Sequence, residues 1–301
     1  MQEFALTLVV ARVFNEKIVI FADTKVSDPS NSKRSPLQGV LKIVILNPHL
    51  AIAYAGVIDY AEAAIKNLLF IEPMPIGHVL SVLEEASETA NKQVDFIVAS
   101  LQGGPALYKI SDGRTSGKLP SAWLGNHAAF EPYQREYASA PETTEIPYRM
   151  RDAFISVLSS GSIDDVGGFP ISVHVHPGLT SPMLVYHMSL TFHNPEEFSV
   201  GSDWVPMPLG TVERGSFCLS QLRTVNLSRH GVALHFFPGN FGILFCPQIS
   251  FAPIQFKDVT AIEFSQRLKK EYGLTLEGII PLGGDDSFQL IGPSEAETIT
   301  P

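Results

Sequence analysis

Short apolar runs rich in β-branched residues dominate the first part of the chain and predict antiparallel hairpins. Two of these runs, at residues 6–13 and 17–22, are separated by a turn at residues 14–16. Two more, LKIVIL and LAIAYAG, are joined by the turn-forming residues 47–49. Because the second pair is apolar at nearly every position, we expect its sheet to be covered on both faces.

After residue 56 the spacing of apolar residues changes from that of strands to that of helices. Asp59 is the expected N-cap of a first helix. The further elements expected are a helix at 77–92, strands at 95–101, 106–110 and 121–125, helices at 128–137 and 148–159, and a strand at 169–175. Strands grouped in hairpins with paired helices between them predict an α+β fold.

The last third of the chain has a different pattern, broken by proline and glycine. Its clearest features are a β-hairpin at residues 231–247 and a helix at about 260–272, and residues 283–301 have the composition of a polar tail. We therefore expect a core domain at 1–193 and an extension at 194–301, whose hairpin is a candidate to complete the sheets of the core.

Composition excludes several classes of function. The chain carries 21 Lys and Arg against 31 Asp and Glu, a formal net charge of −10, which disfavours binding to nucleic acid. No stretch of about 20 apolar residues is present to span a membrane. Two cysteines are too few for a disulfide framework or a zinc site. We expect a cytoplasmic protein that needs no cofactor.

Several short motifs follow one another between residues 7 and 168: TLVVA from Thr7, ADTK, LKIVILNPHLAIAYAG, Asp59 at a helix start, LYKISDG, WLGN and DVGG. In this order and spacing they resemble a proteasome β-type subunit, a member of the N-terminal-nucleophile hydrolase superfamily. The resemblance implies a four-layer αββα sandwich of two mainly antiparallel sheets. It also implies self-association into an oligomer or ring, and a peptide or amide substrate.

The resemblance assigns roles to five residues. Thr7 lies at the position of the family's nucleophile, Asp23 and Lys42 at those of its acidic and basic partners, and Asp165 at that of a supporting aspartate. The backbone N–H near Gly56 lies where the family has its oxyanion donor.

Catalysis by these residues requires one condition. A threonine hydroxyl is a weak nucleophile until a base takes its proton, and the family uses the free α-amine of the same threonine. That amine titrates at roughly 7.7–8.0, and a nearby lysine favours its neutral form. In the uncut chain the Thr7 nitrogen is an amide and no base. Activity therefore requires cleavage between Leu6 and Thr7.

Three departures from the family pattern keep a second interpretation open. Leu6 stands where the family usually has glycine, Asn126 where active members have serine, and Val166 where they often have serine. These residues favour a non-catalytic, proteasome-like scaffold for assembly or for binding a partner. The set around Thr7 favours a hydrolase.

Histidines provide the one candidate for a metal. His174 and His176 alternate along a strand, so they share a face, and His187 joins them if the next strand pairs in simple register. Three imidazoles can bind zinc or copper. Solvent-facing histidines are the more common outcome, and we predict no metal site.

Overall fold

The computed structural model divides the chain into two compact units, Met1–Val185 and Tyr186–Pro301. The expected boundary lay somewhat later, after residue 193. The structure describes residues 7–26, 39–69, 71, 73–160, 163, 165–177, 181–193, 217–226, 228–237, 239–281 and 288–292. Both units combine helices with antiparallel strands, which confirms the expected α+β class.

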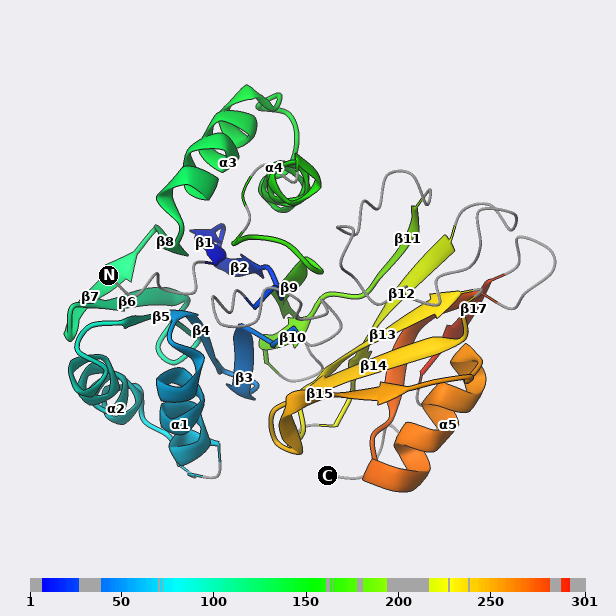
Figure 1. Ribbon diagram of the computed structural model, residues 1–301. Helices are drawn as coiled ribbons and strands as arrows, with labels where there is room; N and C mark the ends of the chain where they lie inside the picture. The colour runs from blue at the N-terminus through cyan, green and yellow to red at the C-terminus, as the bar shows by residue number, and fades with distance from the viewer. Residues whose placement is uncertain are drawn as a thin grey trace. The chain divides into compact units, whose positions relative to one another are not determined.

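The first sheet of unit 1 has five strands in the order β10-β9-β2-β1-β8 (Figure 1). These strands are β1 (Leu8–Phe14), β2 (Lys17–Ala22), β8 (Ser121–Gly125), β9 (Ile171–His176) and β10 (Met183–Tyr186). The β1–β2 turn has positive φ angles at Asn15 (43°) and Glu16 (59°), as a two-residue hairpin turn requires. This tight turn fixes the register that pairs Val9 with Ala22 at the other end of the hairpin.

The second sheet of unit 1 has five strands in the sequential order β3-β4-β5-β6-β7. They are β3 (Ile43–Asn47), β4 (Leu50–Gly56), β5 (Val94–Ser100), β6 (Ala106–Ser111) and β7 (Arg114–Leu119). The strand β7 was not predicted, because its residues, RTSGKL, are half-exposed or exposed and lack apolar alternation. It forms through pairing with β6 at the edge of the sheet.

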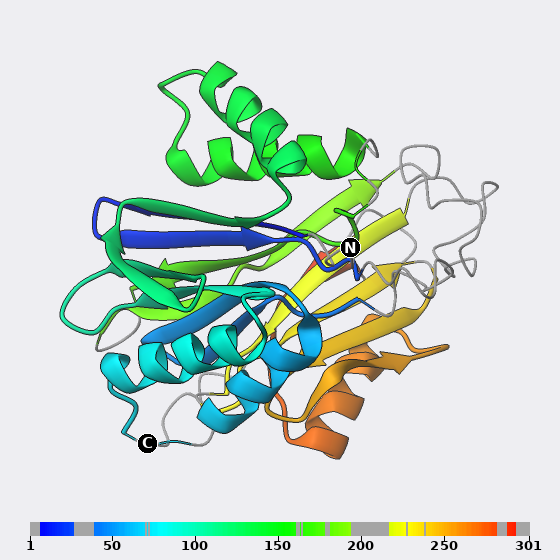
Figure 2. The ribbon, with the colours of Figure 1, turned by 60° about the vertical axis from the view of Figure 1, so that its left-hand side comes forward.

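Two pairs of helices cover the two sheets of unit 1 on opposite sides (Figure 2). They are α1 (Ile58–Leu68), α2 (Ile76–Thr89), α3 (His127–Ser139) and α4 (Ile146–Ser160). The helices α1 and α2 pack on β4, β5 and β6, while α4 packs on β2. Apolar residues of α3 and α4, among them Tyr133 and Phe154, form one buried cluster with Leu8 and Phe21 of the first sheet.

The N-terminus of α1 differs from the expectation. Val57 is the N-cap and has no capping side chain, whereas Asp59 lies in the first turn. A carboxylate in the first turn still interacts favourably with the helix dipole. The apolar spacing of the helix was therefore predicted correctly, but the capping residue was wrong.

Unit 2 has a sheet of its own with seven strands, β15-β14-β13-β12-β16-β17 plus β11 paired to β12. They are β11 (Ser189–His193), β12 (Phe217–Thr224), β13 (Val232–Phe237), β14 (Phe241–Cys246), β15 (Ser250–Phe256), β16 (Leu276–Pro281) and β17 (Phe288–Ile291). One helix, α5 (Ala261–Tyr272), packs on this sheet around Phe264 and Leu268. Thr260 and Glu263 form a capping box at its start.

The structure differs from two expectations. The described residues form three sheets, not two, because the strands from Ser189 onward pair only with one another. Within the polar tail expected at 283–301, residues 288–291 form β17, since they pair with β16 and place Leu290 opposite Ile279. Apart from residue 292, the rest of that expected tail lies outside the described residues. Within the described ranges, none of the helices combines the length and the apolar character needed to cross a membrane.

Candidate active site

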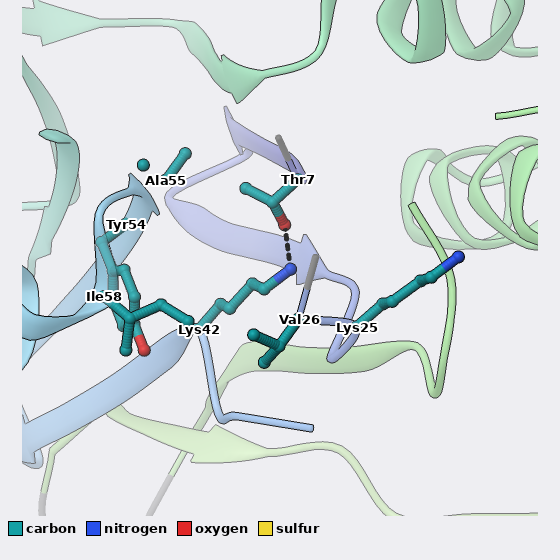
Figure 3. Close-up of a pocket in the computed structure, with 8 residues that line it drawn as sticks. Thr7, Lys25, Val26, Lys42, Tyr54, Ala55 and Ile58 are labelled. Carbon is teal, nitrogen blue, oxygen red and sulfur yellow. Dashed lines mark hydrogen bonds between the residues drawn. The ribbon is translucent and has the colours of Figure 1, made fainter. Parts of the chain in front are cut away.

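Three polar residues from different parts of unit 1 meet in its interior. Thr7 directly precedes β1 and Asp23 directly follows β2. Because β1 and β2 are antiparallel, the start of one lies beside the end of the other. Lys42 precedes β3 and reaches this point from the second sheet, as Figure 3 shows.

These side chains form a closed network of hydrogen bonds. The Lys42 Nζ donates to Thr7 Oγ1 at 2.5 Å and to both carboxylate oxygens of Asp23 at 3.0 Å. The Thr7 hydroxyl donates to Asp23 Oδ1. Thr7, Asp23 and Lys42 are only 2%, 0% and 5% exposed. The hydroxyl oxygen is thus held, away from bulk water, between an ammonium and a carboxylate.

Backbone groups fix the Asp23 carboxylate in place. The Leu8 N–H donates to Oδ1 at 3.1 Å, and the Gly167 N–H donates to Oδ2 at 3.2 Å. The first bond ties Asp23 to β1, and the second ties it to the loop before β9. Asp23 therefore links β1 to the loop before β9, in addition to its place in the hydrogen-bond network.

Burial lowers the pKa of the Lys42 ammonium below its ordinary value. The charge of Asp23 and its hydrogen bond raise this pKa, and the charge of Lys25 lowers it further. Asp165 raises it as well, as the last of these contributions. The result is an amine that loses its proton more readily than an exposed lysine.

The carbonyl group of Thr7 is held by the residues at the end of β8 and the start of α3. Its oxygen accepts a hydrogen bond from the Asn126 N–H at 2.7 Å. Gly125 has a φ of +97°, and a Cβ atom there would lie 1.8 Å from the Thr7 oxygen. Glycine is therefore required at this position. The Asn126 side chain accepts a hydrogen bond from the Ala128 N–H at 2.8 Å and so caps α3.

A small pocket opens beside the network. Its lining residues are Thr7, Lys25, Val26, Lys42, Tyr54, Ala55, Gly56 and Ile58. Gly56 has a φ of +109°, and a Cβ atom there would lie 2.1 Å from the Gln93 carbonyl oxygen. The chain thus needs glycine at the point where its backbone passes the pocket.

Most of the residues assigned by resemblance come together. Thr7, Asp23 and Lys42 contact one another, and Gly56 lines the same pocket. Asp165 influences Lys42 through its charge, and its loop contributes the Gly167 N–H to the network.

Lys25 and Tyr54 were not predicted to line the pocket, and Gly125 was not predicted to support Thr7. Lys25 lies two positions after Asp23, and Tyr54 lies two positions before Gly56. This closeness in sequence to two assigned residues was the one indication of their place in the site.

Within the described part of the chain, no three His, Cys, Asp or Glu side chains are grouped so that they could hold a metal ion. The candidate set His174, His176 and His187 is therefore not such a group, and His174 instead bonds Ser172 Oγ at 3.0 Å. The thiols of Cys218 and Cys246 are free, and burial raises the pKa of each to about 11.

The arrangement has the parts of a nucleophile site. A hydroxyl oxygen contacts a buried lysine and a buried carboxylate, and it borders a small pocket. Comparison with protein-family models and with curated proteins found no match for this chain.

Proposed function

We propose that unit 1 is an amide hydrolase, of the N-terminal-nucleophile class, that uses Thr7 after cleavage of the bond before it. The observation that carries this proposal is the position of Thr7 Oγ1, which contacts both Lys42 and Asp23 in a buried site. A structural threonine at the start of a strand has no need of two buried charged partners, because burying charge is costly.

The layers of unit 1 support the same proposal. Two antiparallel sheets lie between one helix pair on each outer side. This order agrees with the four-layer αββα sandwich of the proteasome β-type subunits that the sequence motifs resemble. The proposal therefore rests on fold and site together, and fold alone would not carry a function.

In the proposed reaction, the free α-amine of Thr7 takes the proton from Oγ1 as this oxygen attacks the substrate carbonyl carbon. Lys42, at 2.5 Å from Oγ1, stabilises the negative charge on the attacking oxygen. The backbone N–H near Gly56 is the proposed donor to the substrate oxyanion. The C–N bond then breaks, the leaving amine takes the proton, and water hydrolyses the resulting ester to restore the hydroxyl.

The alternative is a proteasome-like scaffold without catalysis. One observation favours it: the Asn126 side chain caps α3, so the residue after Gly125 offers no hydroxyl to the proton-transfer network. Under either proposal we expect self-association into an oligomer or ring. The two free thiols agree with a reducing, cytoplasmic location.

Intact-mass measurement together with peptide turnover tests the proposal. We expect a species that begins at Thr7 and hydrolyses fluorogenic peptide amides. Thr7→Ala should reduce turnover by about 10³-fold or more, because the nucleophile is lost. Thr7→Ser should retain part of the activity, and Thr144→Ala, in the α3–α4 connection, should leave it unchanged.

Two results would decide against a hydrolase at Thr7. One is a chain that keeps its first six residues and still cleaves amides, which would require another nucleophile. The other is a chain cut before Thr7 that cleaves none. In the second case, unchanged assembly of the Thr7→Ala chain on size-exclusion chromatography would support the scaffold.

A further inference from the structure

Thr24 directly follows Asp23 in the chain, and its buried hydroxyl contacts the loop before β9. The residue is 0% exposed. Its Oγ1 accepts a hydrogen bond from the Phe169 N–H at 2.8 Å. Gly168 has a φ of +75°, and a Cβ atom there would lie 2.5 Å from the same oxygen. The backbone of the loop therefore lies directly against the Thr24 hydroxyl.

The same loop also contacts the residues on either side of Thr24. The Gly167 N–H donates to Asp23 Oδ2 at 3.2 Å, and the Gly167 carbonyl oxygen accepts from the Lys25 N–H at 3.1 Å. The three residues that follow β2 thus each hold the loop by one hydrogen bond. Asp23 Oδ2 in turn accepts the bond of 3.0 Å from Lys42 Nζ. The position of the loop therefore affects the carboxylate that pairs with Lys42.

We propose that Thr24 is a positioning residue, whose hydroxyl holds the loop so that the Gly167 N–H stays on Asp23 and the buried Asp23–Lys42 pair stays closed. Thr24 itself takes no part in proton transfer or bond breaking, because its hydroxyl bonds the loop. The catalytic part of this inference rests on the proposed hydrolase function, whereas the effect on Lys42 does not.

A hydroxyl that only satisfied a backbone N–H would affect stability alone. Thr24 differs because its backbone also holds the segment that leads to Lys42: its carbonyl oxygen accepts from the Val40 N–H at 3.0 Å. Thr24 thus adjoins one member of the charged pair and contacts the segments that support both. A buried ion pair is stable only with good geometry and further hydrogen bonds, so release of the loop should open the pair.

The test measures how readily Lys42 reacts with a reagent. Thr24→Val removes the hydroxyl but keeps the shape of the side chain and the backbone contact to Val40. The full-length chain is treated with limiting acetic anhydride, and the labelling rate of each lysine is measured by mass spectrometry of its peptides. Lys42 is 5% exposed, and Lys66, which is 57% exposed, is the internal reference. We expect Lys42 labelling to rise about tenfold in Thr24→Val, as the loss of one buried hydrogen bond allows.

Two further variants separate positioning from stability. Thr24→Ser keeps the hydroxyl, so Lys42 should react as slowly as in the unaltered chain. Ser87→Ala is the matched control in unit 1: Ser87 lies on α2, is 0% exposed, and its Oγ accepts one backbone N–H, that of Gly113, at 3.2 Å. This variant should lower the melting temperature about as much as Thr24→Val, yet leave Lys42 labelling within about twofold.

A second substitution reaches the same state from the loop. In Gly168→Ala the added Cβ atom would press against Thr24 Oγ1, and alanine is strained at this positive φ, so the loop should move. We expect faster labelling of Lys42 in this variant too, which keeps the inference testable if Thr24→Val fails to fold.

The inference is overturned if Lys42 labelling is unchanged in both Thr24→Val and Gly168→Ala, if it rises as much in Ser87→Ala, or if Thr24→Ser labels as fast as Thr24→Val. Turnover of peptide amides tests the catalytic part: Thr24→Val should lower kcat about tenfold with KM unchanged, and an unchanged kcat would overturn this part. A chain without any turnover would refute the hydrolase proposal, while the labelling of Lys42 would still decide the role of Thr24.

Discussion

In unit 1 the buried polar side chains of Thr7, Asp23 and Lys42 hydrogen-bond one another, whereas in unit 2 the buried side chains of Ser220 and His235 are only partly paired. Ser220 and His235 lie directly opposite on β12 and β13, and both are 0% exposed. The His235 Nε2–H donates to the Val259 carbonyl oxygen at 2.9 Å. Among the described residues, neither His235 Nδ1 nor Ser220 Oγ has a partner.

The difference reflects the kind of group that is buried, charged in unit 1 and neutral in unit 2. Buried charges are tolerated only where they neutralise and hydrogen-bond each other, so removal of one partner leaves an isolated charge. A buried neutral hydroxyl or imidazole can remain partly unpaired at a cost of about 1–3 kcal/mol. The charged network of unit 1 and the Ser220–His235 pair of unit 2 should therefore respond differently when a polar group is deleted.

The largest effect on stability is expected in unit 1, when the charge of Lys42 is removed. Lys42→Met should destabilise this unit by about 3–5 kcal/mol, because the Asp23 carboxylate stays buried without its counter-charge. Hydrogen exchange in peptides from β1 and β2 measures the loss. The matched control is Lys66→Met, which breaks an exposed pair with Glu62 (3.4 Å) and should cost less than about 1 kcal/mol. Equal effects of the two substitutions would contradict the comparison.

An intermediate effect on stability is expected when His235 takes up a proton. Burial lowers the pKa of His235 in the folded chain, although its bond to Val259 opposes this shift. The unfolded chain, with an ordinary value of about 6.5, therefore binds the proton more readily. The stability of unit 2 should fall as pH drops below about 6.5, by up to about 1.4 kcal/mol per pH unit, and level off below the folded pKa.

Hydrogen exchange of β13 and α5 between pH 7 and pH 5 measures this dependence. His235→Gln removes the titrating group, so the slope should flatten in that chain. A slope that persists in His235→Gln would assign the pH dependence to another residue.

The smallest effect is expected at Ser220. Ser220→Ala removes a hydroxyl without a described partner, so stability should stay within about 0.5 kcal/mol or rise slightly. Thr224→Val is the matched control on the same strand: its hydroxyl donates to the Arg229 carbonyl and accepts from the Gly231 N–H, both at 2.7 Å. That substitution should cost about 1–3 kcal/mol in thermal or chemical unfolding. A cost at Ser220 as large as at Thr224 would mean that Ser220 is paired.

The elements that sequence predicted well are those with strong periodic patterns. The apolar runs of β1 to β4 and the spacing of α1 to α4 specified those elements to within a few residues. The strand β7 was missed because its residues, RTSGKL, carry no such pattern, and β17 was missed because it is a short segment in a polar region. Both strands form at sheet edges, through pairing that local sequence does not encode.

The candidate site could be anticipated only in part. The motifs placed Thr7, Asp23 and Lys42 in family positions, and the structure brings them into contact. Tyr54 could not be distinguished from a core residue, since it lies in a fully apolar strand. The partly unpaired state of His235 likewise depends on strands and loops that are distant in sequence.

The contacts that hold Thr7 lie on its C-terminal side, so they do not depend on the bond before it. The Asn126 N–H holds the Thr7 carbonyl, and Asp23 holds the next N–H of the chain. A cut before Thr7 would leave both contacts in place, so the proposed activation would expose an amine without moving the hydroxyl. Such a step acts as a one-time, irreversible switch, and the activity of a cut molecule would end only with its inhibition or removal.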